Sequence, residues 1–207
     1  MLSVALLVGI SALFWFVMFS PWITFPINFW LLMFIATGLL GGLGLALQRK
    51  QFTELYFFKP RFVVIGIVAA AALYAIFFVG EVLSTRFFDF AKPEIIKVYD
   101  TRDLASPVVI GALLMFWIGP AEEIFWRGLV QQRLVENCGA VIGYLTASFL
   151  YAAIHIFALN FMLLMASLIC GLFWGALFLK YKSVWPGIIS HALWDVAIFV
   201  VFPIRQM

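Results

Sequence analysis

Three ionisable side chains stand inside an otherwise apolar run in the stretch Gly119-Pro120-Ala121-Glu122-Glu123-Ile124-Phe125-Trp126-Arg127. A charged residue at the centre of a bilayer costs on the order of 3 kcal/mol, so a carboxylate pair there indicates a function. On a helix, Glu123 precedes Arg127 by four residues, the favourable order for an ion pair. Glu122 lies about 100° further round the helix and cannot share that face. We therefore predict that Glu123 and Arg127 form a structural pair, which leaves Glu122 as the candidate for chemistry.

The composition is that of an integral membrane protein. Of the 207 residues, 66% are hydrophobic and only 11% are charged, whereas charged residues make up about 25% of soluble domains. The length suffices for several spanning helices of roughly 20 residues each and leaves little for a soluble domain. Lys and Arg are scattered at the ends of apolar segments, so no basic block indicates a nucleic acid partner. The lipid bilayer is the expected environment.

The hydrophobic pattern predicts an all-α polytopic membrane protein, a bundle of about seven transmembrane helices. The apolar stretches are residues 2–20, 27–47, 62–84, 107–135, 139–159, 161–180 and 184–203. Pro21 and Pro26 end the first helix and start the second, which makes a helical hairpin. We divide the chain into N-terminal transmembrane helices with surface segments (1–106) and a transmembrane core that carries the candidate site (107–207).

The connections and small residues add three expectations. The second apolar stretch carries four glycines that let a neighbouring helix approach closely. Residues 48–61 mix cations with aromatic side chains and are predicted to lie at the membrane surface; residues 85–106 are interpreted as a surface-lying segment near the site, either a lid or a plain connecting loop. Lys and Arg are more frequent in the second, fourth and sixth connections between successive apolar stretches than in the others. This distribution favours a cytoplasmic N-terminus. The glycines are Gly38, Gly41, Gly42 and Gly44.

The chain has two histidines, and both fall inside apolar segments. A lone buried histidine is usually a packing residue, but His155 and His191 together with Glu122 indicate a functional cluster. Asp195 follows His191 by four residues, so the two side chains share a helix face. A hydrogen bond between them would fix the tautomer of the imidazole.

Depth in the membrane offers an independent test of this cluster. If residues 107–135 and 139–159 form an antiparallel hairpin, Glu122 and His155 both lie roughly 24 Å from its turn and can face each other. The first of these helices must then project from the membrane, and the polar run 131–133 suits that. His191 lies only about nine residues beyond Lys182, so it needs a deeper turn or a tilted helix to join them.

Three motifs in order on three hydrophobic segments resemble those of the CAAX-protease and bacteriocin-processing family. The resemblance covers roughly residues 107–203. Eukaryotic members of that family cleave prenylated proteins, and its best-described mechanism is that of a glutamate-type intramembrane protease. The motifs are Glu122-Glu123 followed by Arg127, Tyr151 four residues before His155, and His191 followed by Asp195.

By this resemblance, Glu122 and His155 activate the attacking water, and His191 with the residue at position 195 stabilises the oxyanion. Two positions depart from the family pattern. Tyr151 stands where the family usually has Phe, which brings a hydroxyl group near the site. Asp195 stands where the prenyl-protein proteases have Asn. Because an ionised Asp cannot donate a hydrogen bond, Asp195 must be protonated or must instead orient His191.

The leading interpretation is an intramembrane endopeptidase that acts on a membrane-associated protein or peptide, with Glu122 as general base and no cofactor. One alternative is a zinc peptidase in which Glu122, His155 and His191 are ligands, since two His and one Glu form a known catalytic set. Another is a transporter or scaffold with a proton-relay cluster. A transporter should show broken helices in both halves, whereas the polar residues here lie in one half. The cysteines Cys138 and Cys170 lack the paired spacing of a disulfide or thiolate metal site.

Overall fold

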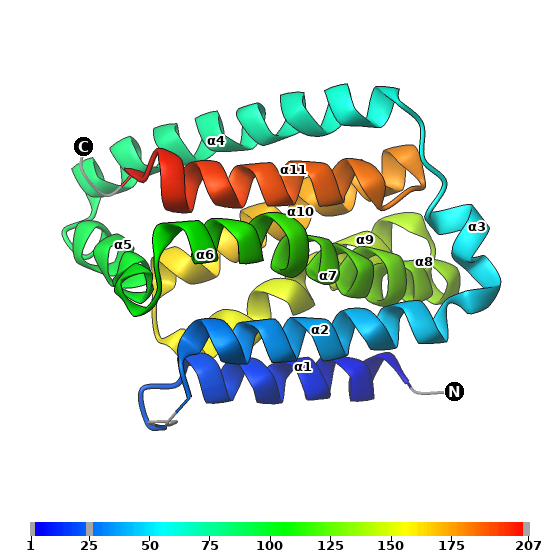
Figure 1. Cartoon of the computed structure of the whole chain (residues 1–207), viewed down its shortest axis with the longest axis horizontal. Helices are drawn as coiled ribbons and strands as arrows, with labels where there is room; N and C mark the ends of the chain where they lie inside the picture. The colour runs from blue at the N-terminus through cyan, green and yellow to red at the C-terminus, as the bar shows by residue number, and fades with distance from the viewer. Residues whose placement is uncertain (1–2, 24–26, 205–207) are drawn as a thin grey trace.

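The computed structural model describes residues 3–23 and 27–204, and within these ranges the chain is helical, with no strand (Figure 1). Hydrophobic helices occupy all seven predicted stretches, so the predicted fold class is confirmed. Among the described residues, five helices are long and apolar enough to cross a membrane, and the first and last are shorter. In chain order they are α1 (Val4–Phe19), α2 (Phe29–Leu47), α4 (Arg61–Phe87), the continuous helix Pro107–Cys138, α9 with η5 (Ala140–Ala158), α10 (Phe161–Tyr181) and α11 with η6 (Trp185–Val201).

The helix Pro107–Cys138 carries the two glutamates and changes its winding along its length. Pro120 has no N–H and its ring crowds the carbonyl group four residues earlier, so a regular α-turn cannot continue through it. The wider π-helical turn η3 precedes this proline, and a second π-helical segment, η4, follows the glutamates. Such π turns are frequent at functional sites. The segments are α6 (Pro107–Leu113), η3 (Leu114–Ile118), α7 (Gly119–Glu123), η4 (Ile124–Gln131) and α8 (Gln132–Cys138).

Helix α2 packs against this helix through three of its four glycines. A β-carbon at each of the three would lie only 2.9–3.0 Å from a side-chain atom across the interface, which only glycine avoids. Gly42 has open space around its Cα, so the prediction of close packing is wrong for that position. Helix α2 therefore fixes one face of the helix Pro107–Cys138 around α7. The contacts are Gly38 with Trp117, Gly41 with Ala121 and Gly44 with Ile124.

The segment that follows α2 covers the turn between α10 and α11 at one end of the bundle (Figure 1). It contains η1 (Arg49–Gln51) and α3 (Phe52–Leu55). Ser183 Oγ donates to the Phe57 carbonyl at 2.9 Å, and the Val184 N–H donates to the Leu55 carbonyl at 3.0 Å. Ser183 and Val184 are 0% and 1% exposed. The turn before His191 is thus buried within the protein, and its depth in the membrane stays a prediction.

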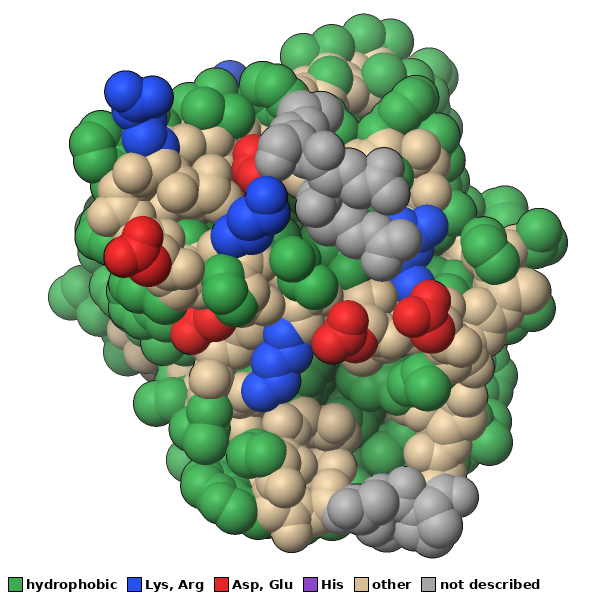
Figure 2. All heavy atoms as spheres, turned by 90° about the vertical axis from the view of Figure 1, so that its left-hand side faces the viewer, with side chains coloured by type: hydrophobic (Ala, Val, Ile, Leu, Met, Phe, Trp, Pro, Cys, Tyr) green, Lys and Arg blue, Asp and Glu red, His purple; other side chains and the backbone are tan. Residues whose placement is uncertain are grey.

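Residues 85–106 form helices rather than a loop, and they close the opposite end of the bundle. Glu94 Oε2 accepts a hydrogen bond from the Met162 N–H at 2.9 Å, and Tyr99 Oη donates to the Ile198 carbonyl at 3.0 Å. These contacts tie the segment to α10 and η6. Figure 2 shows this end of the molecule, where charged side chains of both signs are dispersed among hydrophobic ones. After α4, the elements are α5 (Ala91–Tyr99) and η2 (Asp100–Leu104).

The polar run 131–133 begins with a residue that is buried inside the protein. Gln131 is 1% exposed, and its Nε2 donates to the Gly175 carbonyl on α10 at 2.9 Å. A buried amide group must find partners inside the protein, and an α10 carbonyl group supplies one here. The projection of this run beyond the membrane stays a prediction.

Helices from both halves of the chain share one hydrophobic core. Leu7 and Trp15 of α1 and Leu73 of α4 pack in the same cluster as Phe125 and Trp174. Helix α1 begins at one end of the long axis and η6 ends at the other (Figure 1), which fits an odd number of crossings. The cytoplasmic N-terminus and the division at residue 106 stay predictions, and Pro26, predicted to start the second helix, lies outside the described residues.

Candidate active site

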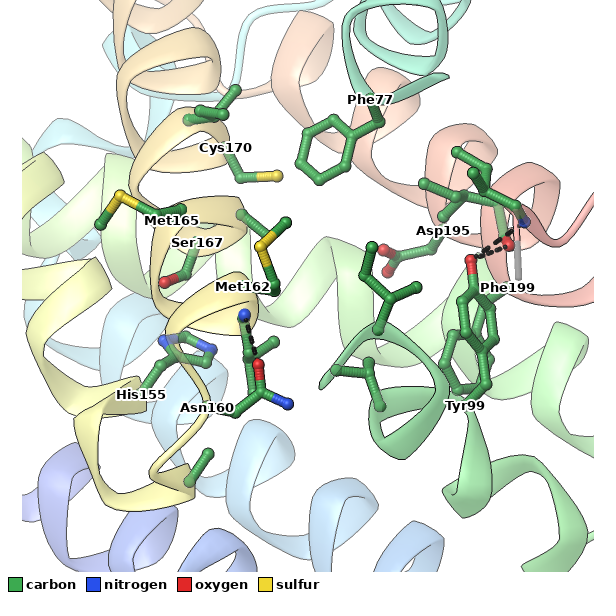
Figure 3. A pocket seen from close by; sticks show the side chains of 18 of the residues that line it. Phe77, Tyr99, His155, Asn160, Met162, Met165, Ser167, Cys170, Asp195 and Phe199 are labelled. Carbon is green, nitrogen blue, oxygen red and sulfur yellow. Dashed lines mark hydrogen bonds between the residues drawn. The ribbon is translucent and has the colours of Figure 1, made fainter. Parts of the chain in front are cut away.

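A cavity of about 730 Å³ lies inside the bundle, and the residues predicted to carry the chemistry line its wall. Side chains of α4, α5, α10 and α11 make most of that wall, and they are mainly apolar. Figure 3 shows His155 on one side of the cavity and the Asp195 carboxyl group pointing into it from the other. The predicted residues on the wall are Glu122, Tyr151, His155, His191 and Asp195.

Glu123 and Arg127 form the predicted ion pair. Arg127 Nη1 lies 2.9 Å from Glu123 Oε1, and the two residues are 2% and 0% exposed. Arg127 Nη2 also donates to the Cys170 carbonyl at 3.3 Å, and the guanidinium group lies 4.8 Å from the centre of the Tyr151 ring. Arg127 thereby connects the helix that carries Glu123 to α9 and α10, which makes this pair a structural centre of the bundle.

Glu122 points away from this pair, as its position on the helix predicts. It is 7% exposed, and its Oε2 accepts a hydrogen bond from Tyr151 Oη at 3.0 Å. Within the described ranges, no Lys, Arg or His forms an ion pair with it. The hydroxyl group expected near the site is therefore bound to the candidate base itself.

His191 is held between two carboxyl groups. Its Nδ1 lies 3.0 Å from Glu123 Oε1, and its Nε2 lies 3.4 Å from Asp195 Oδ2. The ring stacks on Trp174 with a centroid distance of 3.7 Å and an interplanar angle of 16°. Because the Glu123 carboxylate that pairs with Arg127 can only accept hydrogen bonds, His191 Nδ1 is the donor in the first contact. The contact of His191 with Asp195 was predicted, whereas its contact with Glu123, 68 residues away, was not.

His155 lies on the short 3₁₀ segment η5 (Ile154–Ala158), and both of its ring nitrogens have partners. Trp15 Nε1 donates to His155 Nε2 at 3.0 Å, and His155 Nδ1 lies 2.9 Å from the Tyr151 carbonyl oxygen. The sequence analysis did not single out Trp15. The sequence feature that could have indicated it is an indole N–H in an apolar helix, because lipid offers this group no hydrogen-bond acceptor.

Glu81 was also missed. It lies in α4, is 9% exposed and lines the same cavity. The signal that found Glu122, an ionisable residue inside an apolar stretch, applies to Glu81 as well.

The proposed zinc ligands do not form a metal-binding group. In the part of the chain that the structure describes, no cluster of three or more His, Cys, Asp or Glu side chains is placed to hold a metal ion. His155 offers no unoccupied nitrogen, and both nitrogens of His191 face carboxyl groups. Cys138 and Cys170 are free thiols.

The fold and the cavity define a polytopic membrane protein with carboxyl groups and two imidazole groups on the wall of a mainly apolar cavity. Residues 104–197 match the family model described as type II CAAX prenyl endopeptidase, Rce1-like. This segment, which carries all three motifs, is therefore similar to the CAAX-protease family of endopeptidases, as the motifs predict. The match ends at Ala197, the first residue of η6, and does not include α1, α2 or α4. Neither the curated proteins nor the solved structures gave a match.

Proposed function

We propose that the chain is an intramembrane endopeptidase that hydrolyses a peptide bond of a membrane-associated protein or peptide, with Glu122 as the general base. The observation that carries this proposal is the contrast between adjacent carboxyl groups. Glu123 is fully buried against Arg127 and His191, whereas Glu122 lines the cavity with a single neutral hydroxyl group bound to it. A carboxyl group free of a cationic partner in a water-poor site is suited to take a proton from water.

In the proposed reaction, Glu122 removes a proton from a water molecule as the water oxygen attacks the carbonyl carbon of the substrate. The carbonyl oxygen becomes the oxyanion of a tetrahedral intermediate. When the carbon–nitrogen bond breaks, the proton held by Glu122 passes to the leaving amine, which restores the carboxylate. The products are a carboxylic acid and an amine, and no cofactor takes part.

His191 and Asp195 are the proposed oxyanion-stabilising groups. The proposed donor to the oxyanion is the proton that His191 Nε2 or Asp195 Oδ2 carries, which leaves the contact between these two atoms and turns to the substrate oxygen. Glu123 holds the opposite nitrogen of the ring, and the stack on Trp174 fixes the ring plane. Donors fixed before the reaction stabilise a developing charge without reorganisation, which is often the largest single contribution to catalysis.

The substrate class follows from the surroundings of the cavity. Its wall is largely apolar and includes residues of α4 and α10, such as Phe77, Ile169 and Met165. A substrate with apolar groups next to the cleaved bond suits such a wall. The description of the matching family makes a prenylated peptide a suitable first probe.

The test compares purified wild-type protein with Glu122→Gln, using a farnesylated peptide and its unprenylated counterpart as probes. Glutamine nearly preserves the shape and the hydrogen bond from Tyr151 but removes the base. We expect Glu122→Gln to keep wild-type thermal stability and to lose turnover, while the exposed control Glu54→Gln keeps activity. Full activity in Glu122→Gln would exclude the proposed base. Stoichiometric zinc by elemental analysis, with loss of activity to chelators, would favour the zinc peptidase instead.

A further inference from the structure

Helix α1 lies outside the segment that matches the family, yet it contributes a side chain to the site. Trp15 is 1% exposed, and its indole N–H donates to His155 Nε2 at 3.0 Å. The two rings meet edge to face, with centroids 5.8 Å apart and an interplanar angle of 75°. Phe19, one turn further along α1, also lies against His155, with the ring centroids 6.0 Å apart. The imidazole ring of His155 therefore contacts α1 as well as its own helical segment.

These contacts determine where the proton of His155 resides. An indole N–H can only donate, so His155 Nε2 must be the accepting, unprotonated nitrogen. The Tyr151 carbonyl oxygen can only accept, so His155 Nδ1, 2.9 Å away, must carry the hydrogen. The ring is thus neutral, in the Nδ1–H tautomer, and the lone pair of Nε2 is directed at α1.

We propose that Trp15 is a positioning residue for His155, which it holds in one tautomer with the accepting nitrogen occupied. In this arrangement His155 Nε2 cannot take a proton while the indole N–H is in place, so the proton of the attacking water goes to Glu122; without the indole N–H, the freed nitrogen competes with Glu122 for it. The inference rests on the proposed function for its effect on turnover. The tautomer itself is independent of any activity.

The chain offers a direct measurement, because it contains only two histidines. Nitrogen-15 labelling of histidine and tryptophan gives two imidazole signal sets, and His155→Gln assigns the one that belongs to His155. In the wild type we expect His155 to show a protonated Nδ1, an unprotonated Nε2 and a scalar coupling from Nε2 across the hydrogen bond to the indole nitrogen. Absence of this coupling, or a protonated Nε2, would overturn the proposal without any variant of Trp15.

The variant Trp15→Phe keeps an aromatic ring against His155 but removes the N–H. We expect His155 to lose its single tautomer and kcat to fall about tenfold with KM unchanged, as for the loss of one hydrogen bond that acts on the reaction. The matched control is Trp185→Phe, which removes an indole N–H that donates to the Tyr56 carbonyl at 2.8 Å on the other side of the bundle. The control should leave the histidine signals and kcat unchanged.

Two results with Trp15→Phe would contradict a positioning role. One is a His155 tautomer unaltered by the substitution. The other is a lost tautomer with unchanged kcat. Failure of the proposed function is a separate result, because turnover would then persist in Glu122→Gln whatever the nitrogen signals show.

Discussion

Glu122 and Glu123 are neighbours in the chain but belong to two different regions of the molecule. Glu123 is in the ionic cluster behind the cavity, where it is 0% exposed and contacts Arg127 and His191. Glu122 is on the cavity wall, where, among the described residues, Tyr151 alone donates a hydrogen bond to it. The rotation of the helix by about 100° from one residue to the next separates the two environments. The cluster can bury a charge because the charge is paired there, and the same helix presents the second carboxyl group to the cavity.

The largest expected effect comes from breaking the cluster. Arg127→Ala leaves Glu123 as a buried carboxylate with one partner removed, which typically costs about 3–5 kcal/mol. We expect a large fall in folded yield and melting temperature. Arg127→Lys should restore stability only in part, because the ammonium group cannot reproduce both the ion pair and the contact of Nη2 with the Cys170 carbonyl. Thermal unfolding of the purified proteins measures the stability of both variants. Normal stability with lost cleavage in Arg127→Ala would place Arg127 in the reaction.

The cluster also shows what the sequence could and could not predict. The pairs Glu123–Arg127 and His191–Asp195 are each four residues apart on one helix, so periodicity alone predicts them. The contacts Glu123–His191 and Trp15–His155 join residues 68 and 140 positions apart. Such contacts depend on how the helices pack, and hydropathy does not encode that packing.

For the fold as well, the sequence predicts the individual helices but not the contacts between them. Seven apolar stretches define the helices because the hydrocarbon region requires long apolar segments with their backbone groups satisfied internally. The sequence did not show that the amide group of Gln131 is buried against the Gly175 carbonyl. Polarity alone does not distinguish a side chain that reaches water from one that bonds a neighbouring helix. Residues 85–106 were interpreted as a surface segment, but the sequence did not show that they form helices fixed to α10 and η6.

A smaller effect should follow from disturbing the space beside Glu123 while its partners remain. A β-carbon at Gly187 of α11 would collide with Glu123 Oε2, and Arg127 and His191 hold that carboxyl group in place through its other oxygen, Oε1. We expect Gly187→Ala to destabilise the protein by about 1–3 kcal/mol, as overpacking of a buried site does. The control is Gly42→Ala, where the added carbon meets nothing within 4 Å. Equal melting temperatures for the two variants would show that the cluster is not rigid.

The smallest effect concerns the cavity side of the comparison, where Tyr151→Phe removes the hydroxyl group that donates to Glu122. This substitution restores the residue that the family usually has at the position, so the hydroxyl should not be essential. Its loss removes one hydrogen bond, which contributes about 1 kcal/mol. Because a factor of ten in rate corresponds to about 1.4 kcal/mol, we expect kcat to fall less than about tenfold. The ring contact of Tyr151 with the Arg127 guanidinium group, at 4.8 Å, is retained by Phe, so the melting temperature should change little. Steady-state kinetics with the farnesylated peptide, beside thermal unfolding, measures both quantities. A loss of turnover as complete as that expected for Glu122→Gln would mean that the Tyr151 hydroxyl group itself takes part in the reaction, and that the two glutamates differ by more than their charged partners.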